Sequence, residues 1–210
     1  MTPTRQALRA ATSAAHDRVD AAFADFDLTD RGSYARFLAA HADVVWALEA
    51  ALPGERVVDD WEERKRGELL KEDLAHLPKL TPNRHPDESR DLRQGSEEEA
   101  ARDPGFRRDD DIDIDALPAF DTDHAIAGTL YVLEGSRLGG KFLARRLSPG
   151  FPRAYLDADQ RAEKWQQLLS VIDRQLHEPA ALDKAIAAAL ATFAAFERSA
   201  EKWRKAGLGE

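Results

Sequence analysis

Apolar residues recur at intervals of three or four positions along most of the chain, which is the spacing of one face of an α-helix. The pattern predicts helices over residues 3–26, 33–52, 59–77, 123–147, 158–176 and 180–205. The strict alternation of apolar and polar residues that marks a strand is scarce. We therefore predict an all-α fold, a helical bundle in one domain spanning residues 1–210.

Helix-starting and helix-ending residues set the expected boundaries. Pro3 suits the first turn of a helix, because a backbone N–H at that position would have no partner within the helix anyway. Asp30 and the residues after it form a break, with Ser33 the expected N-cap of the second helix. Pro53 and Gly54 end that helix.

Residues 78–118 differ from the rest of the chain in being charged, rich in proline and poor in apolar residues. We predict a charged loop insertion there, with a short helix near residues 96–101. Residues 109–115 read Asp-Asp-Asp-Ile-Asp-Ile-Asp, but this run lacks the glycine and terminal glutamate of a calcium-binding EF-hand loop. A solvated loop is the favoured interpretation.

Composition excludes several classes of function. The chain has no cysteine, which rules out disulfides, thiolate metal sites and a cysteine nucleophile, and fits a cytoplasmic protein. A net charge of −9 argues against binding to nucleic acid. No run of about 18 apolar residues and no signal peptide is evident, so we expect no membrane association.

One face of the first predicted helix gathers residues suited to binding haem. Arg9, His16 and Phe23 are seven positions apart and so lie on nearly one line, with Thr12 and Asp20 beside it. A neutral imidazole is a good ligand for haem iron, and Asp20 could accept its other N–H. Arg9 could pair with a propionate. The alternative is that His16 is a partly buried structural histidine.

The helix predicted over residues 123–147 contains Gly135, Gly139 and Gly140, with Ser136 among them. Each glycine inside a helix costs roughly 1 kcal/mol relative to alanine, so three close together require a use. One use is close packing of two helices. The other is to let the backbone approach a flat ligand and to let the helix kink. The sequence alone favours neither.

The two features together resemble one protein family. Residues 8–16, followed by Asp20, resemble the proximal helix of haem oxygenases. Residues 130–140 resemble the glycine-rich distal helix of the bacterial members, in particular those associated with bacterial phytochromes. The resemblance extends over most of the chain except about residues 78–118.

This resemblance implies haem held between a proximal and a kinked distal helix and oxidised to biliverdin, ferrous iron and carbon monoxide. Haem is then both substrate and cofactor. Oxygen is consumed, and a ferredoxin, a flavin reductase or ascorbate supplies electrons; a bacteriophytochrome could receive the biliverdin. By position, His16 is the axial ligand. The expected haem-binding residues are Arg9, Thr12, His16, Asp20, Phe23, Lys141 and Arg145, and the expected catalytic positions are Gly135, Ser136, Gly139 and Gly140.

The chain departs from the family pattern in places. Ser136 stands where many members have an aspartate that holds distal waters, which leaves proton delivery unassigned. Asp20 stands where glutamate is common, and Ser13 where some members have a lysine that binds a propionate. Lys141 and Arg145 could meet propionates or form a solvated face.

Other interpretations stay open. A haem carrier or sensor shares the proximal motif, and a helical interaction protein could keep the fold without the ligand. His41 could compete as a ligand or be a core histidine. Glu72 and His76, with Glu49 and Glu134, could hold two irons, as in some proteins of similar fold. The related thiaminase type needs a cysteine and is excluded.

Overall fold

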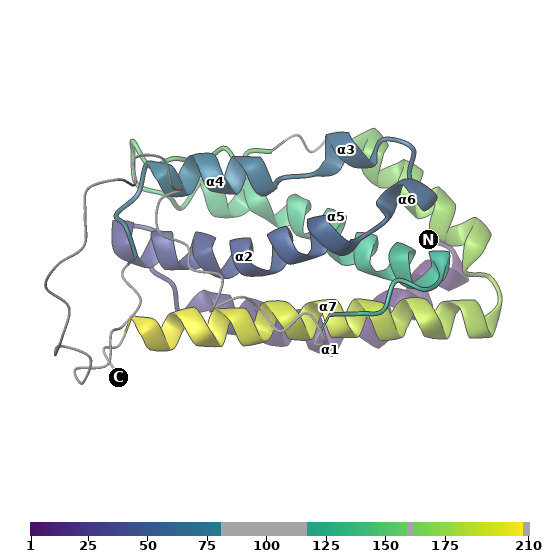
Figure 1. Cartoon of the computed structure of the whole chain (residues 1–210). Helices are drawn as coiled ribbons and strands as arrows, with labels where there is room; N and C mark the ends of the chain where they lie inside the picture. Colours follow the sequence, from purple (N-terminus) through teal and green to yellow (C-terminus); the bar gives the residue numbers. More distant parts are fainter. Residues whose placement is uncertain (81–116, 159–161, 208–210) are drawn as a thin grey trace, which may run out of the picture.

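The computed structural model describes residues 1–80, 117–158 and 162–207, and all regular structure within them is helical (Figure 1). The all-α prediction is therefore confirmed. The elements are α1 (Pro3–Ala24), α2 (Arg31–Ala51), the short 3-10 helix η1 (Gly54–Arg56), α3 (Trp61–Arg64), α4 (Gly67–Ala75), α5 (Asp123–Ala144), α6 (Ala162–Gln175) and α7 (Pro179–Ala206). The predicted insertion falls mostly, and its short helix wholly, outside the described residues.

The start of α2 differs from the prediction. Asp30, not Ser33, is the N-cap: its backbone is extended, and its carboxylate accepts a hydrogen bond of 2.7 Å from the Ser33 N–H. Ser33 lies inside the first turn, where its hydroxyl accepts from the Asp27 N–H at 2.8 Å. Both residue types cap helices well, so the local sequence did not separate them.

The helix predicted over residues 59–77 is wrong as one element, because it is broken into α3 and α4. The chain is extended at Lys65, and the Glu49 carboxylate of α2 accepts from the N–H groups of Arg66 at 2.6 Å and Gly67 at 2.9 Å. Gly67 also lies so close to Trp46 that an added Cβ would be 2.8 Å from the indole Cδ1. Contacts with α2 therefore override the helical pattern.

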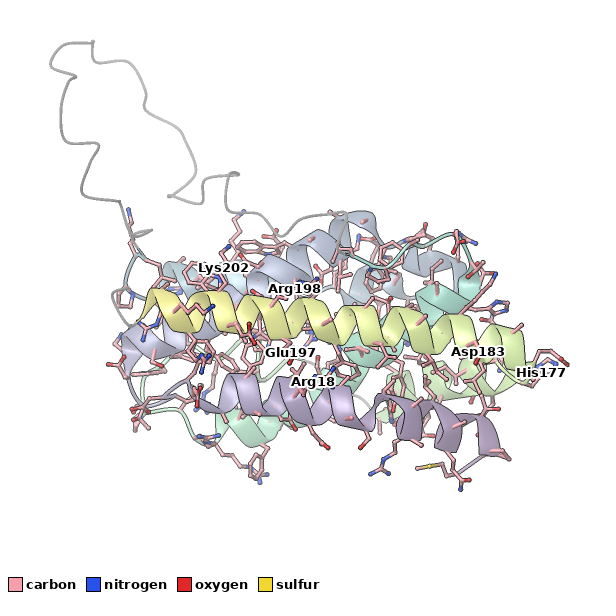
Figure 2. All side chains as sticks on the ribbon, turned by 90° about the horizontal axis from the view of Figure 1, so that it is seen from below. Arg18, His177, Asp183, Glu197, Arg198 and Lys202 are labelled. Carbon is pink, nitrogen blue, oxygen red and sulfur yellow. The ribbon has the colours of Figure 1, made fainter. Side chains whose placement is uncertain are left out.

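The long helix α7 is the centre of the bundle and contacts α1, α2 and α5. In Figure 2, α1 and α7 lie side by side, and Arg18 of α1 faces Glu197 of α7, with 3.2 Å between the Nε and Oε2 atoms. The approach of α5 to α7 is closest at Gly128, where an added Cβ would lie 2.1 Å from the Ala185 carbonyl oxygen. Gly128 is therefore required for this helix crossing.

By length and composition alone, α7 passes the test for a helix that could cross a membrane. The core helix of a soluble protein passes the same test, and α7 is covered by three other helices. Its residues Ala185, Ala189 and Ala195 have no exposed surface. Packing within the bundle therefore accounts for its apolar character.

Candidate functional site

His16 lies on α1 with its side chain 59% exposed. Its Nδ1 atom is 3.2 Å from Asp20 Oδ2, one turn later, and its ring meets the edge of Phe193 on α7 with 5.8 Å between the ring centroids. The carboxylate holds the Nδ1 side of the imidazole, and Phe193 limits how the ring can turn. The Nε2 atom is then the one that a metal can reach.

The other predicted residues of this α1 face have different environments. Thr12 is buried, and its hydroxyl donates to the Leu8 carbonyl at 2.9 Å. Burial raises the pKa of Tyr131 on α5, and Thr12 and Arg9 of α1 oppose that rise, so Tyr131 lies near this face of α1. Arg9 is exposed, whereas Phe23 is half-buried.

Three glycines share one face of α5, but their surroundings differ. Gly128 is tightly packed against α7. Gly135, seven residues later, would place a Cβ 3.9 Å from the tip of Trp165, which is ordinary contact, and a Cβ at Gly139 would have no atom within 4 Å. The face therefore opens along α5, and helix packing explains neither Gly135 nor Gly139. Gly140 is buried.

Ser136 has hydrogen bonds that the sequence did not predict. Its hydroxyl donates to the Leu133 carbonyl at 2.7 Å and accepts from Arg66 Nη2 at 2.8 Å. Arg66 lies between α3 and α4 and is only 5% exposed. Its position in a run of charged residues is typical of a solvated surface, so the sequence carried no signal for this contact.

A buried ion network lies beside this contact. Glu134 of α5 binds Arg64 at 3.1 Å and Arg137 at 2.9 Å, and Arg64 also binds Asp60 at 2.6 Å. Burial lowers the pKa of Arg137 from its usual value. The carboxylate of Glu134 is therefore fully engaged by guanidinium groups.

The interpretation as a two-iron site finds no support in these positions. Glu134 is paired with arginines, and Glu49 caps α4. The ring of His76 bonds only to the backbone of Glu72, through Nδ1 at 2.8 Å from the carbonyl oxygen. Over the described parts of the chain, His, Asp and Glu nowhere form a group of three that could hold a metal ion.

His41 is a core histidine rather than an exposed ligand. Its ring centroid lies 4.4 Å from those of Phe23 and Phe37, and its Nδ1 is 2.8 Å from the Phe37 carbonyl oxygen. Burial lowers the pKa of His41 to about 4, so the ring is neutral near pH 7. Because Nδ1 donates to the carbonyl, Nε2 carries the lone pair.

The end of α5 beyond the glycines is exposed and mixed in character. Lys141 and Arg145 are exposed and form no ion pair within the described residues. Leu138 and Phe142, one turn apart on the same helix, are 52% and 67% exposed. The structure thus leaves two cations and two apolar side chains uncovered close to Gly139.

Comparison with known proteins gives one informative match. No family model matches the chain. Over 91 residues the chain is 38% identical to the protein named "Heme oxygenase" of Xanthomonas campestris pv. campestris (strain 8004), a match covering 40% of this chain and 55% of that protein. The chain thus spans about half the length of the relative. This similarity supports the haem oxygenase family and does not distinguish a subgroup within it.

Proposed function

We propose that this protein is a haem oxygenase that binds haem between α1 and α5 and converts it to biliverdin, ferrous iron and carbon monoxide. The partial relative named "Heme oxygenase" supports the family. The observation that carries the proposal is the open glycine face of α5. At Gly128 this face is pressed against α7, whereas at Gly139 it meets nothing within 4 Å.

The residues present fit a flat iron porphyrin. An exposed imidazole with one nitrogen held by a carboxylate offers the other to the iron, as at His16 and Asp20. A helix wall without side chains, at Gly135 and Gly139, lets the backbone approach a planar ring. The rings of Phe193 and Phe23 provide apolar surface for the porphyrin to pack against.

Within this proposal each residue has a physical role. Haem, when bound, supplies both the iron that reacts with oxygen and the ring carbon that is oxidised. Asp20 fixes the orientation of the His16 ring and raises the basicity of its Nε2 atom. Thr12 of α1 and Tyr131 of α5 lie near one another and would border one end of the haem, where they limit the entry of water.

We further propose that Arg9, Lys141 and Arg145 act on the propionate groups. All three are exposed cations, as the binding of a carboxylate at the rim of a pocket requires. The electrons would come from a ferredoxin, a flavin reductase or ascorbate. Release of biliverdin to a bacteriophytochrome is the destination that the sequence resemblance favours.

The test is an absorption time course. The protein is mixed with one equivalent of haem, then given ascorbate and catalase in air. We expect a sharp Soret band that decays into the broad red absorption of biliverdin. His16→Ala should form no such Soret band, and imidazole should restore it. The matched control is His177→Ala, since His177 is similarly exposed (64%) and lies in the connection just before α7 (Figure 2).

The same experiment separates the alternatives. A Soret band that forms and persists under reducing conditions would contradict the oxygenase and favour a haem carrier or sensor. The absence of a Soret band in the unmodified protein would contradict haem binding itself. Equal loss in the His16 and His177 variants would point to a general effect on folding.

A further inference from the structure

Trp165 of α6 borders the glycine segment of α5. The tip of its indole, atom Cη2, would lie 3.9 Å from a Cβ added at Gly135. One turn further along α5, a Cβ added at Gly139 would meet nothing within 4 Å. The side-chain-free surface of α5 is therefore bounded at Gly135 by the indole and open beyond it.

Tyr131 of α5 supports the indole. The centroids of the Tyr131 and Trp165 rings are 5.7 Å apart, with 33° between the ring planes. Both side chains are partly buried and pack against the core. Tyr131 also lies near Thr12 and Arg9 of α1. Tyr131 and Trp165 thus form an aromatic wall that extends from α6 towards the face of α1 that carries His16.

The backbone that carries Trp165 is held by the ion network of α3. The carbonyl oxygen of Lys164 accepts from Arg64 Nη1 at 3.3 Å and from Arg64 Nη2 at 3.2 Å. Arg64 in turn binds Glu134, the residue before Gly135. The indole is therefore fixed relative to α5 both by its own contact and through Arg64. Because packed interiors yield little, the wall should keep its position when a ligand enters.

We propose that Trp165 sets the orientation of the haem within the site and so selects which meso carbon is oxidised. This inference rests on the proposed function. The haem ring is nearly symmetric in outline, and cations at the rim of a pocket recognise only the edge that carries the two propionates. The other edges differ in the order of their methyl and vinyl groups. A fixed aromatic wall can distinguish these groups by shape, which makes Trp165 a specificity-determining residue.

The test measures haem orientations by proton NMR of the full chain loaded with ferric haem and cyanide. Each orientation gives its own set of shifted ring-methyl signals, so the proportions are read without turnover. We expect one predominant set in the unmodified protein. Trp165→Ala should change the ratio of the major to the minor orientation by about three- to ten-fold, the effect of losing an aromatic contact. Trp165→Phe keeps a smaller ring and should change the ratio less.

The matched control is Trp203→Phe, which removes the same atoms as Trp165→Phe at a distant place. Trp203 is partly buried, and its Nε1 atom donates to Asp43 at 2.8 Å. It lies beyond Phe193 on α7, about 15 Å further along the helix from the ring that meets His16. We expect this control to leave the orientation ratio unchanged.

Unchanged orientations in both Trp165 variants, or an equal change in Trp203→Phe, overturn the proposal. An unmodified protein that holds haem equally in two orientations does the same. Should Trp165→Ala not fold, as judged by circular dichroism and thermal melting, the comparison of Trp165→Phe with Trp203→Phe decides.

Turnover with ascorbate gives the second readout. The mixture of biliverdin isomers, separated by chromatography, should shift in the same variants as the haem orientations. An unchanged mixture despite changed orientations overturns the role of Trp165 in specificity. Failure of the proposed function is separate, because it appears as an absent Soret band or absent turnover in the unmodified protein.

Discussion

Two glycines on one face of α5 should respond in opposite ways to substitution. In the protein without haem, a side chain at Gly139 meets no atom within 4 Å of its Cβ, so Gly139→Leu removes only the cost of a glycine inside a helix. We expect a gain in the free energy of unfolding of about 0.5–1 kcal/mol. For a chain of this size, that corresponds to a rise in melting temperature of roughly 1–4 °C.

The contrasting substitution is Gly128→Ala. Its new methyl group would lie 2.1 Å from the Ala185 carbonyl oxygen and 2.8 Å from the carbonyl carbon, both of them backbone atoms. Since the helices must separate to accept it, we expect a loss of about 1–3 kcal/mol despite the better helix propensity of alanine.

We expect Gly139→Leu to lower the haem affinity even though it raises the stability. A leucine there occupies the space that we assign to the porphyrin, so we expect haem binding to weaken at least about ten-fold, the effect of a steric cost of 1.4 kcal/mol or more. Thermal melting by circular dichroism gives the stability, and titration of the Soret band gives the affinity.

Two results would refute this reasoning. A lower melting temperature in Gly139→Leu would mean that the protein itself packs against this position. Unchanged haem affinity in a stable Gly139→Leu variant would mean that the glycine face does not border the haem, and the proposed function would lose its main structural support.

Three other variants test the site and its support. Asp20→Asn should weaken haem binding on the order of ten-fold in a Soret titration, because an amide supports the His16 imidazole less well than a carboxylate; the exposed neighbour Asp17→Asn is the control, and equal affinities would contradict the role of Asp20. Glu134→Ala removes the buried carboxylate that Arg64 and Arg137 share, so urea unfolding should show a loss of about 3–5 kcal/mol, and a loss below about 1 kcal/mol would argue against the network. His41 has its pKa lowered from 6.5 to about 4 in the folded protein, so the unfolded chain binds more protons between these values and stability falls as the pH drops from 6.5 towards 4. The contribution is roughly 3 kcal/mol, and His41→Phe should remove this part of the pH dependence, whereas an unchanged slope would mean that the ring is protonated in the fold.

The positions of most helices followed from the sequence because their signals are local. The apolar period and the caps lie within each helix, and α1, α5 and α7 begin and end within three residues of the expected positions. The break between α3 and α4 was missed because its causes, Glu49 and Trp46, lie about one helix earlier in the chain. A pattern read within one segment does not contain such contacts.

The same distinction explains which parts of the candidate site were predictable. His16 and Asp20 are one turn apart, so their contact follows from helical spacing alone. The bond from Arg66 to Ser136 joins residues 70 positions apart, and that from Arg64 to Glu134 does the same. In sequence, these arginines belong to a charged run that reads as a solvated surface, yet Arg64 has no exposed side-chain surface. Their burial depends on carbonyl and carboxylate groups presented by α5, so the polar half of the site exists only once α5 has packed against the segment containing α3 and α4.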